Sequence, residues 1–243
     1  MRLPLLTAAW MAASAPAAAI VGASGADATL EAQTLMVLKR SGAAAGFCSG
    51  VVLSQRLVLT AAHCVAGAAD TRLHFRDASG APILAAIDRI AIHPAYRAGA
   101  AERRERSIDL AIVRAAQPLP ARFATARLST REALAIGERV RLGGYGVARE
   151  NAAETSGVFR VATLATRAPL SKILLWSEDG AGAGAGACTG DSGGPMADGS
   201  GAIVAIAAWS AGQGRRGCGG VTQGILIAPQ RDWIERVVDA LSR

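Results

Sequence analysis

Short apolar segments separated by turn-forming residues recur along most of the chain, and this pattern constrains the fold more than any other feature. The segments are residues 34–38, 50–53, 56–60, 83–92, 110–113, 139–142, 157–164, 203–209 and 224–227. Runs of this length that end at turn residues are typical of β-strands, and closely spaced strands favour a barrel or a sandwich. We therefore predict an all-β fold.

The C-terminal segment, residues 229–242, departs from the strand pattern. Its apolar residues recur with the spacing of one helix face, and they are Trp233, Ile234, Val237, Val238 and Leu241. Pro229 suits the start of a helix, so we predict a short C-terminal helix here. Two prolines, Pro118 and Pro120, mark a junction that divides the preceding strands into two groups, about 20–120 and about 121–228.

The N-terminal residues have the three parts of a secretory signal peptide. Arg2 supplies a positive charge, residues 5–13 are apolar, and Ala17-Ala18-Ala19 fits a signal peptidase site. The apolar stretch is too short to span a bilayer, and no later segment has the roughly 18 apolar residues that a membrane helix needs. We predict a signal peptide at 1–19 and a mature chain at 20–243, secreted to the periplasm or the extracellular space.

The four cysteines are then expected in an oxidising compartment, where disulfides persist. Four cysteines allow three pairings, and the residues alone do not choose among them. No cysteine pair has the C-x-x-C spacing, so we expect no zinc site. We identify no metal-ligand loop elsewhere in the sequence and expect no cofactor. Calcium binding stays open.

The formal net charge of +7 favours acidic surfaces or substrates in a general way. The densest basic cluster contains Arg103, Arg104 and Arg106, but Glu102 and Glu105 interrupt it and no aromatic residue accompanies it. A surface that binds nucleic acid usually gathers basic residues on one face. We therefore interpret the cluster as a solvated loop and expect no nucleic-acid partner.

A glycine-rich run, Gly190-Asp191-Ser192-Gly193-Gly194-Pro195, carries the first indication of chemistry. A serine hydroxyl is a poor nucleophile at neutral pH, and it needs a base to take its proton and N–H donors to hold the oxyanion. The run also matches the nucleophile elbow of α/β-hydrolases, in which the histidine follows the serine. All three histidines, His63, His74 and His93, precede Ser192, so the elbow interpretation lacks its base.

His63 and Asp109 are the candidate partners of Ser192. His63 follows the strand-like residues 57–60 and precedes Cys64, which could tie the turn in place. Asp109 begins an apolar run, where a carboxylate is costly to bury unless a partner such as an imidazole N–H satisfies it. The alternative for Asp109 is an exposed strand residue. We interpret His74 and His93 as structural, because no comparable motif surrounds them.

Taken together, the three segments resemble the chymotrypsin family of serine peptidases, the S1 family. The resemblance rests on TAAHC around His63, IDLAIV around Asp109 and GDSGGP around Ser192, in the chain order of that family. Further matches are Ile20-Val21-Gly22, His93-Pro94 with Tyr96, residues 143–146, Trp209 and Trp233-Ile234. The resemblance covers nearly all of residues 20–243, and it implies two packed six-stranded antiparallel β-barrels with a short C-terminal helix.

The resemblance implies a secreted serine endopeptidase that cleaves proteins or peptides without a cofactor. Ser192 is expected to attack the scissile carbonyl, His63 to take and return its proton, and Asp109 to orient the imidazole. The N–H groups of Gly190 and Ser192 are expected to form the oxyanion hole. Two alternatives remain open, a catalytically silent protease-like binding module and an esterase with the same triad. The sequence does not indicate an oligomeric state.

The resemblance also implies two disulfides, Cys48–Cys64 and Cys188–Cys218. It further implies an activation pair, because the family's freed N-terminal amine inserts beside the aspartate that precedes the nucleophile. Here that pair is Ile20 and Asp191. Since Ala19 directly precedes Ile20, signal peptidase itself would create the active N-terminus by cleavage after Ala19. Cleavage after Ala17 is the alternative, and it would leave Ala18-Ala19, an extension that blocks insertion until an aminopeptidase removes it.

The same family comparison indicates which residues surround the S1 pocket, which binds the side chain before the scissile bond. They are Gly186, Ala187, Ser210 and Gly220. None carries charge or much bulk, so we predict a neutral pocket that prefers apolar side chains. A cation there would be desolvated without a counter-charge. Asp179 is expected to approach the pocket only if the Gly-Ala run at 180–187 folds back.

Overall fold

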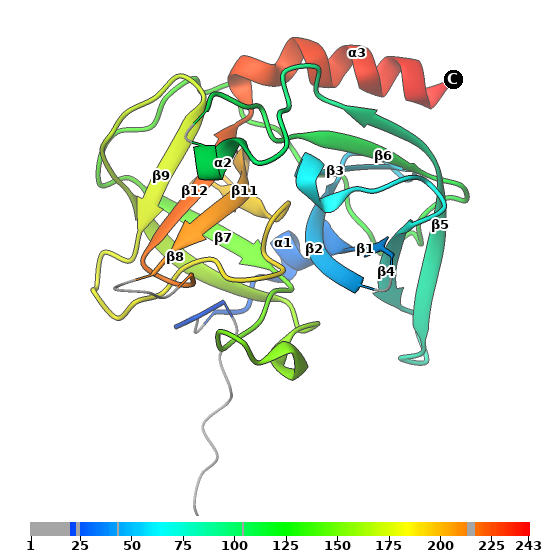
Figure 1. Cartoon of the computed structure of the whole chain (residues 1–243), viewed down its shortest axis with the longest axis horizontal. Helices are drawn as coiled ribbons and strands as arrows, with labels where there is room; N and C mark the ends of the chain where they lie inside the picture. The colour runs from blue at the N-terminus through cyan, green and yellow to red at the C-terminus, as the bar shows by residue number, and fades with distance from the viewer. Residues whose placement is uncertain (1–19, 23–24, 43, 104, 213–216) are drawn as a thin grey trace, which may run out of the picture.

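The computed structural model of the chain describes residues 20–22, 25–42, 44–103, 105–212 and 217–243 (Figure 1). The predicted signal peptide at 1–19, and Arg104 of the basic cluster, lie outside these residues. Within them, twelve strands form two closed barrels, the first on the right of Figure 1 and the second on the left. For this part of the chain the predicted fold class, two six-stranded antiparallel barrels with a C-terminal helix, is confirmed.

The first barrel closes in the order β1-β2-β3-β6-β5-β4. Its strands are β1 (Thr34–Ser41), β2 (Ala44–Val52), β3 (Leu57–Thr60), β4 (Thr71–Arg76), β5 (Pro82–Ile92) and β6 (Ala111–Ala115). Because β3 pairs with β6, with Thr60 opposite Ala111, the end of β3 lies beside the start of β6. His63 lies just beyond the end of β3 and Asp109 just before β6, so this pairing brings the two residues together.

The second barrel closes in the order β10-β11-β12-β9-β8-β7. Its strands are β7 (Arg139–Gly144), β8 (Arg160–Thr166), β9 (Leu174–Glu178), β10 (Pro195–Ala197), β11 (Ile203–Ala211) and β12 (Val221–Leu226). The glycine-rich run with Ser192 enters β10, and the Ser192 carbonyl accepts a hydrogen bond of 2.8 Å from the Ser49 N–H of β2. The nucleophile candidate is therefore held between the two barrels.

Apolar side chains fill each barrel and the seam between them. The first barrel buries Leu35, Val37, Val58 and Leu73, and the second buries Leu142, Leu164, Met196 and Val204. A separate cluster joins the two barrels, and its members include Leu59, Ile112, Phe159, Ile206, Trp233 and Ile234. Because residues of both barrels share this cluster, the barrels pack as one body and hold the residues at their junction in place.

Three helices accompany the barrels in the described residues: α1 (Ala28–Ala32), α2 (Ala100–Arg103) and α3 (Arg231–Ser242). The predicted C-terminal helix corresponds to α3, which runs across the top of Figure 1 and buries Trp233 and Ile234. It begins two residues after Pro229, because Ala228–Gln230 form a 3₁₀ turn before it. None of the described helices has the length and hydropathy needed to cross a membrane.

The sequence pattern missed β4, β9 and β10. It found only the end of β2, with 50–53 predicted against the observed Ala44–Val52, and it placed the other strands within a few residues of their observed bounds. The first barrel ends at Ala115 and the second begins at Arg139, so the expected junction near residue 120 falls in the connecting segment.

Candidate functional site

A cleft of about 1280 Å³ opens between the barrels, and residues from both line it. His63, Asp109 and Phe47 contribute from the first barrel, and Gly190, Ser192 and Trp209 contribute from the second. The structure therefore gathers the three residues of the sequence-predicted triad in one solvent-accessible cleft.

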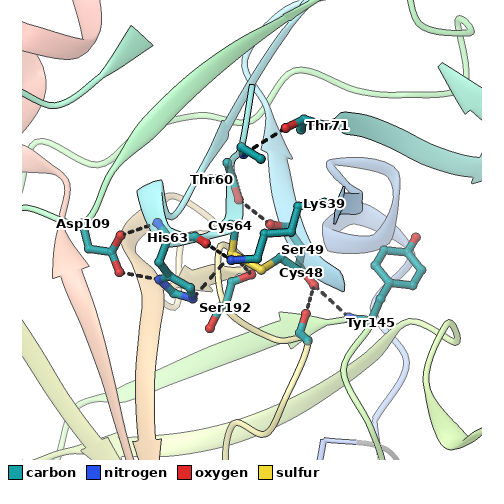
Figure 2. Close-up of a disulfide and its surroundings, with 12 residues drawn as sticks. Lys39, Cys48, Ser49, Thr60, His63, Cys64, Thr71, Asp109, Tyr145 and Ser192 are labelled. Carbon is teal, nitrogen blue, oxygen red and sulfur yellow. Dashed lines mark hydrogen bonds and ion pairs between the residues drawn. A yellow bond between two sulfur atoms is a disulfide. The ribbon is translucent and has the colours of Figure 1, made fainter. Parts of the chain in front are cut away.

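Asp109 contacts His63 through both carboxylate oxygens. Its Oδ2 lies 2.6 Å from the imidazole Nδ1, and its Oδ1 accepts a hydrogen bond of 2.9 Å from the His63 main-chain N–H (Figure 2). The Asp109 side chain is 18% exposed against 36% for His63, so the carboxylate lies on the protected side of the ring. This geometry fixes the proton on Nδ1 and leaves Nε2 as the basic atom of a neutral imidazole.

His63 Nε2 lies 3.6 Å from Cys64 Sγ, and the Ser192 carbonyl oxygen lies 3.8 Å from the same sulfur. Within the described residues, Ser192 forms no hydrogen bond from its hydroxyl to the imidazole. It is held by tight packing of the residue that follows it. Gly193 has a φ of +80°, and a Cβ on this residue would lie 2.1 Å from the Ser49 carbonyl oxygen. Only glycine fits both the backbone conformation and the space, which explains this part of the GDSGGP motif.

The N–H groups of Gly190 and Ser192 are available for a ligand. Within the described residues, neither donates a hydrogen bond to a protein group. Gly190 has a φ of +98°, and a Cβ there would collide with the Phe47 ring at 2.2 Å. A substrate carbonyl oxygen in the cleft can accept hydrogen bonds from these donors without first breaking others, as an oxyanion hole requires.

Asp191, between these two donors, is completely buried. Its carboxylate accepts hydrogen bonds of 2.9 Å from the main-chain N–H groups of Gly146 and Cys188. Burial raises the pKa of Asp191 to about 7, although both hydrogen bonds and the positive charge of Arg160 act in the lowering direction. A carboxyl group in this position calls for a cationic partner if it is to carry its charge at neutral pH.

The first described residues of the chain, 20–22, pack against the second barrel. Ile20 is fully buried in the apolar cluster of the second barrel, which also contains Leu142 and Ala187. The Gly186 N–H donates a hydrogen bond of 3.1 Å to the Val21 carbonyl oxygen. The backbone φ of Ile20 is +55°, which is a strained conformation for a β-branched residue.

Both disulfides implied by the family resemblance are present. The Cα atoms of Cys48 and Cys64 are 6.0 Å apart, and those of Cys188 and Cys218 are 4.5 Å apart. Cys64 Sγ lies 3.6 Å from His63 Nε2, so the first disulfide packs against the imidazole of His63. Cys48, His63 and Cys64 lie close enough to hold a metal ion, but the disulfide bond leaves neither sulfur as a thiolate ligand.

The four residues expected around the S1 pocket lie in different places. Ser210 lines the cleft, whereas Gly186 and Ala187 are buried behind it and Gly220 does not line it. The physical reason is close backbone packing. The Gly219 N–H donates to the Ala187 carbonyl at 3.0 Å, and a Cβ on Gly186 would lie 3.0 Å from the Gly219 carbonyl carbon.

The cleft also contains residues that the sequence reasoning missed. Apolar groups from the second barrel line one part of it, and they are Ile173, Leu174, Trp176 and Ile225. Cations line it as well, and they are Lys39, Arg97 and Arg106. The Lys39 ammonium donates a hydrogen bond to the His63 carbonyl oxygen. A prediction of strand β9 from the sequence would have identified Leu174 and Trp176 of the apolar group. No local sequence pattern indicates that the three cations line the cleft.

The remaining histidines and Asp179 have local partners. His74 Nδ1 lies 2.9 Å from the Ile83 carbonyl oxygen. His93 packs edge-on against Trp233 with a centroid distance of 4.7 Å, and burial lowers the pKa of His93. Asp179 accepts hydrogen bonds from the N–H groups of Ala181 and Ala185, which lower its pKa, and it does not line the cleft.

Comparison with known proteins adds a second line of observation. A family profile described as Trypsin matches residues 20–234. Alkaline trypsin C of Manduca sexta is 30% identical over 188 residues, which cover 67% of this chain and 68% of that protein. Alkaline trypsin A of the same organism is 29% identical over 188 residues, which also cover 67% of this chain and 68% of that protein.

Two solved structures share the fold at low sequence identity. Neuropsin, a serine protease expressed in the limbic system of mouse brain, matches with a TM-score of 0.71 and 19% identity, covering 90% of this chain and 100% of that chain. The scabies mite inactivated protease paralogue S-I1 matches with a TM-score of 0.72 and 21% identity, covering 90% of this chain and 99% of that chain.

Proposed function

The chain belongs to the trypsin family of serine endopeptidases, and from that premise we propose that it hydrolyses peptide bonds with His63, Asp109 and Ser192 as its triad. The observation that carries this proposal is the 2.6 Å contact between Asp109 Oδ2 and His63 Nδ1, in a cleft that Ser192 also lines. No cofactor has a part in the proposed reaction.

In the acylation step the Ser192 hydroxyl oxygen bonds to the scissile carbonyl carbon, and its proton moves to His63 Nε2. The carbonyl oxygen becomes an anion, which the N–H groups of Gly190 and Ser192 stabilise. His63 then gives the proton to the departing amine as the peptide C–N bond breaks. Water repeats the sequence against the acyl-enzyme and regenerates Ser192. Asp109 keeps the imidazole in the tautomer that this proton transfer needs.

A protein-substrate assay separates this function from its two alternatives. Purified mature protein is incubated with casein and, separately, with an activated ester, each with and without a serine-directed fluorophosphonate. We expect the protein to cleave casein and the reagent to stop cleavage. Cleavage of the ester alone would favour an esterase, and failure to cleave either substrate would favour a silent binding module.

We further propose that the protein is secreted and that removal of residues 1–19 activates it. Two observations support this proposal: Ile20 is already buried against the second barrel, and Asp191 is buried without a cationic hydrogen-bond partner among the described residues. The φ of Ile20 is defined with the carbonyl carbon of the preceding residue, so cleavage before Ile20 would abolish this strained angle. The new ammonium could then pair with Asp191. That pair would hold the Gly190 amide in the oxyanion hole.

We therefore expect the chain that starts at Ile20 to be at least about a hundredfold more active than the chain that starts at Ala18, the scale of one lost oxyanion donor. Both forms can be released from a cleavable tag and compared by kcat/KM on one peptide substrate. Equal activity of the two forms would contradict the proposed activation. N-terminal sequencing of the exported protein identifies which form occurs.

The two forms should also differ in how stability depends on pH. In the longer chain the folded pKa of Asp191, about 7, exceeds the ordinary 3.8, so folding is favoured when the carboxyl is protonated. That contribution is complete below the unfolded pKa and is lost as pH rises through about 7. The melting temperature of the longer chain should fall across this window, and that of the Ile20 form should fall less.

We propose a neutral S1 pocket that prefers apolar side chains before the scissile bond. The supporting observations are that the apolar side chains of Ile173, Leu174 and Trp176 line the cleft, and that the Asp179 carboxylate is occupied by main-chain N–H groups outside the cleft lining. A library of peptides that differ only at this position should show at least about tenfold higher kcat/KM for apolar residues than for Arg or Lys. A clear preference for Arg or Lys would overturn the proposal.

A further inference from the structure

The Ser49 hydroxyl connects the first barrel to the loop that carries the oxyanion hole. Ser49 lies on β2 and is fully buried. Its Oγ donates a hydrogen bond of 2.9 Å to the Gly190 carbonyl oxygen, and it accepts one of 3.0 Å from the Tyr145 N–H (Figure 2). This buried hydroxyl is used both as a donor and as an acceptor. It therefore holds the two segments in one arrangement, because a shift of either segment would leave the hydroxyl without a hydrogen-bond partner.

Both groups that Ser49 contacts adjoin the proposed oxyanion hole. Gly190 supplies one of the two available N–H donors, and it has a φ of +98°. A Cβ on Gly190 would lie 2.2 Å from the Phe47 ring and 2.8 Å from the Gly146 Cα, so it packs closely against both residues. Tyr145 immediately precedes Gly146, whose N–H donates to the Asp191 carboxylate. The hydroxyl therefore ties together the residue before Asp191 and the segment that holds its carboxylate.

The main chain of Ser49 acts on the other side of the same loop. Its N–H donates to the Ser192 carbonyl at 2.8 Å, and its carbonyl accepts from Thr60 Oγ1 at 2.7 Å. These main-chain contacts survive replacement of the side chain, so a substitution at Ser49 can remove the link to Gly190 while Ser192 stays anchored. That separation makes the role of the hydroxyl measurable.

We propose that the Ser49 hydroxyl is a positioning group that holds the Gly190 amide in alignment with the developing oxyanion. This inference rests on the proposed triad mechanism and adds a residue that does not touch the substrate. Since the oxyanion forms only during the reaction, loss of the hydroxyl should weaken transition-state binding more than substrate binding.

The test is Ser49→Ala, compared with Ser177→Ala as a matched control. Ser177 is equally buried, and its hydroxyl also donates to a main-chain carbonyl, that of Thr222 at 3.3 Å, away from the cleft lining. We expect Ser49→Ala to lower kcat roughly tenfold while KM changes less than about twofold, a smaller effect than direct loss of an oxyanion donor. Ser177→Ala should leave both constants near the wild-type values.

The affinities of two inhibitors distinguish loss of oxyanion alignment from a general loss of stability. A peptidyl trifluoromethyl ketone forms an oxyanion with Ser192, whereas the corresponding peptidyl alcohol has no carbonyl. Ser49→Ala should weaken binding of the ketone by about the same factor as it lowers kcat/KM, and it should leave binding of the alcohol unchanged. Ser49→Gly, which removes the whole side chain including the hydroxyl, provides a second variant if Ser49→Ala folds poorly.

Unchanged kcat and ketone affinity in folded Ser49 variants, with an active wild-type protein, would overturn the positioning role alone. Equal weakening of the ketone and the alcohol would also overturn it. An inactive wild-type protein that the fluorophosphonate does not label would instead contradict the proposed triad.

Discussion

Replacement of Ser192 by alanine should lower kcat/KM by about 10⁶-fold while the fold stays intact, because the acyl-enzyme can no longer form. The residual rate should reflect only binding and the oxyanion donors, which remain in place. Ser192 is partly exposed, and its hydroxyl has no hydrogen bond to a protein group among the described residues, so its loss leaves no buried partner unsatisfied. The melting temperature should therefore change little.

The measurement is kcat/KM on a peptide substrate together with thermal unfolding, with Ser242→Ala as the control. Ser242 lies at the end of α3, and its hydroxyl donates to the Val238 carbonyl at 2.7 Å, far along the chain from the cleft residues. The control should retain full activity. A Ser192→Ala protein with more than a few per cent of wild-type activity would contradict the assignment of the nucleophile.

Replacement of Asp109 by asparagine should lower kcat/KM by about 10⁴-fold. The amide oxygen can still accept from the His63 main-chain N–H, so the turn Ala62–Cys64 should keep its shape. The amide nitrogen is a donor, and opposite Nδ1 it favours the imidazole tautomer with the proton on Nε2. That tautomer cannot take the proton from Ser192, so the rate falls although the geometry is retained.

Asp88→Asn is a suitable control for this variant. Asp88 lies on β5 and forms an exposed pair with Arg114, with hydrogen bonds of 2.8 and 2.9 Å, so its loss should affect stability slightly and activity not at all. Crystal structures or chemical-shift spectra of Asp109→Asn would establish that the active cleft is undisturbed. If Asp109→Asn kept more than a tenth of the wild-type kcat/KM, Asp109 would not have the proposed role.

The residues of the proposed triad could be identified from the sequence because each lies in a local motif. TAAHC and IDLAIV identify His63 and Asp109, and the pairing of β3 with β6 explains why residues 46 positions apart in the sequence come into contact. The glycines of GDSGGP reflect contacts with Ser49 and Phe47, which a sequence pattern records only as a preference for glycine.

Other features depend on contacts between distant segments, and the sequence pattern missed them. β10 has only three residues, and β9 contains Ser177 and Glu178, so their strand structure comes from pairing with neighbours rather than from an apolar run. In β4 the residues Arg72 and His74 dilute the apolar signal. Gly186 does not line the cleft because its backbone packs against Gly219, and this contact between separate segments is not visible in the sequence.

Covalent labelling of the mature protein tests the central claim most directly. A fluorophosphonate is allowed to react with the protein, and the modified peptide is identified by mass spectrometry. The triad account predicts one adduct per molecule, on Ser192, with complete loss of casein cleavage. An adduct on any other residue, or full proteolytic activity in protein that carries the adduct on Ser192, would contradict it.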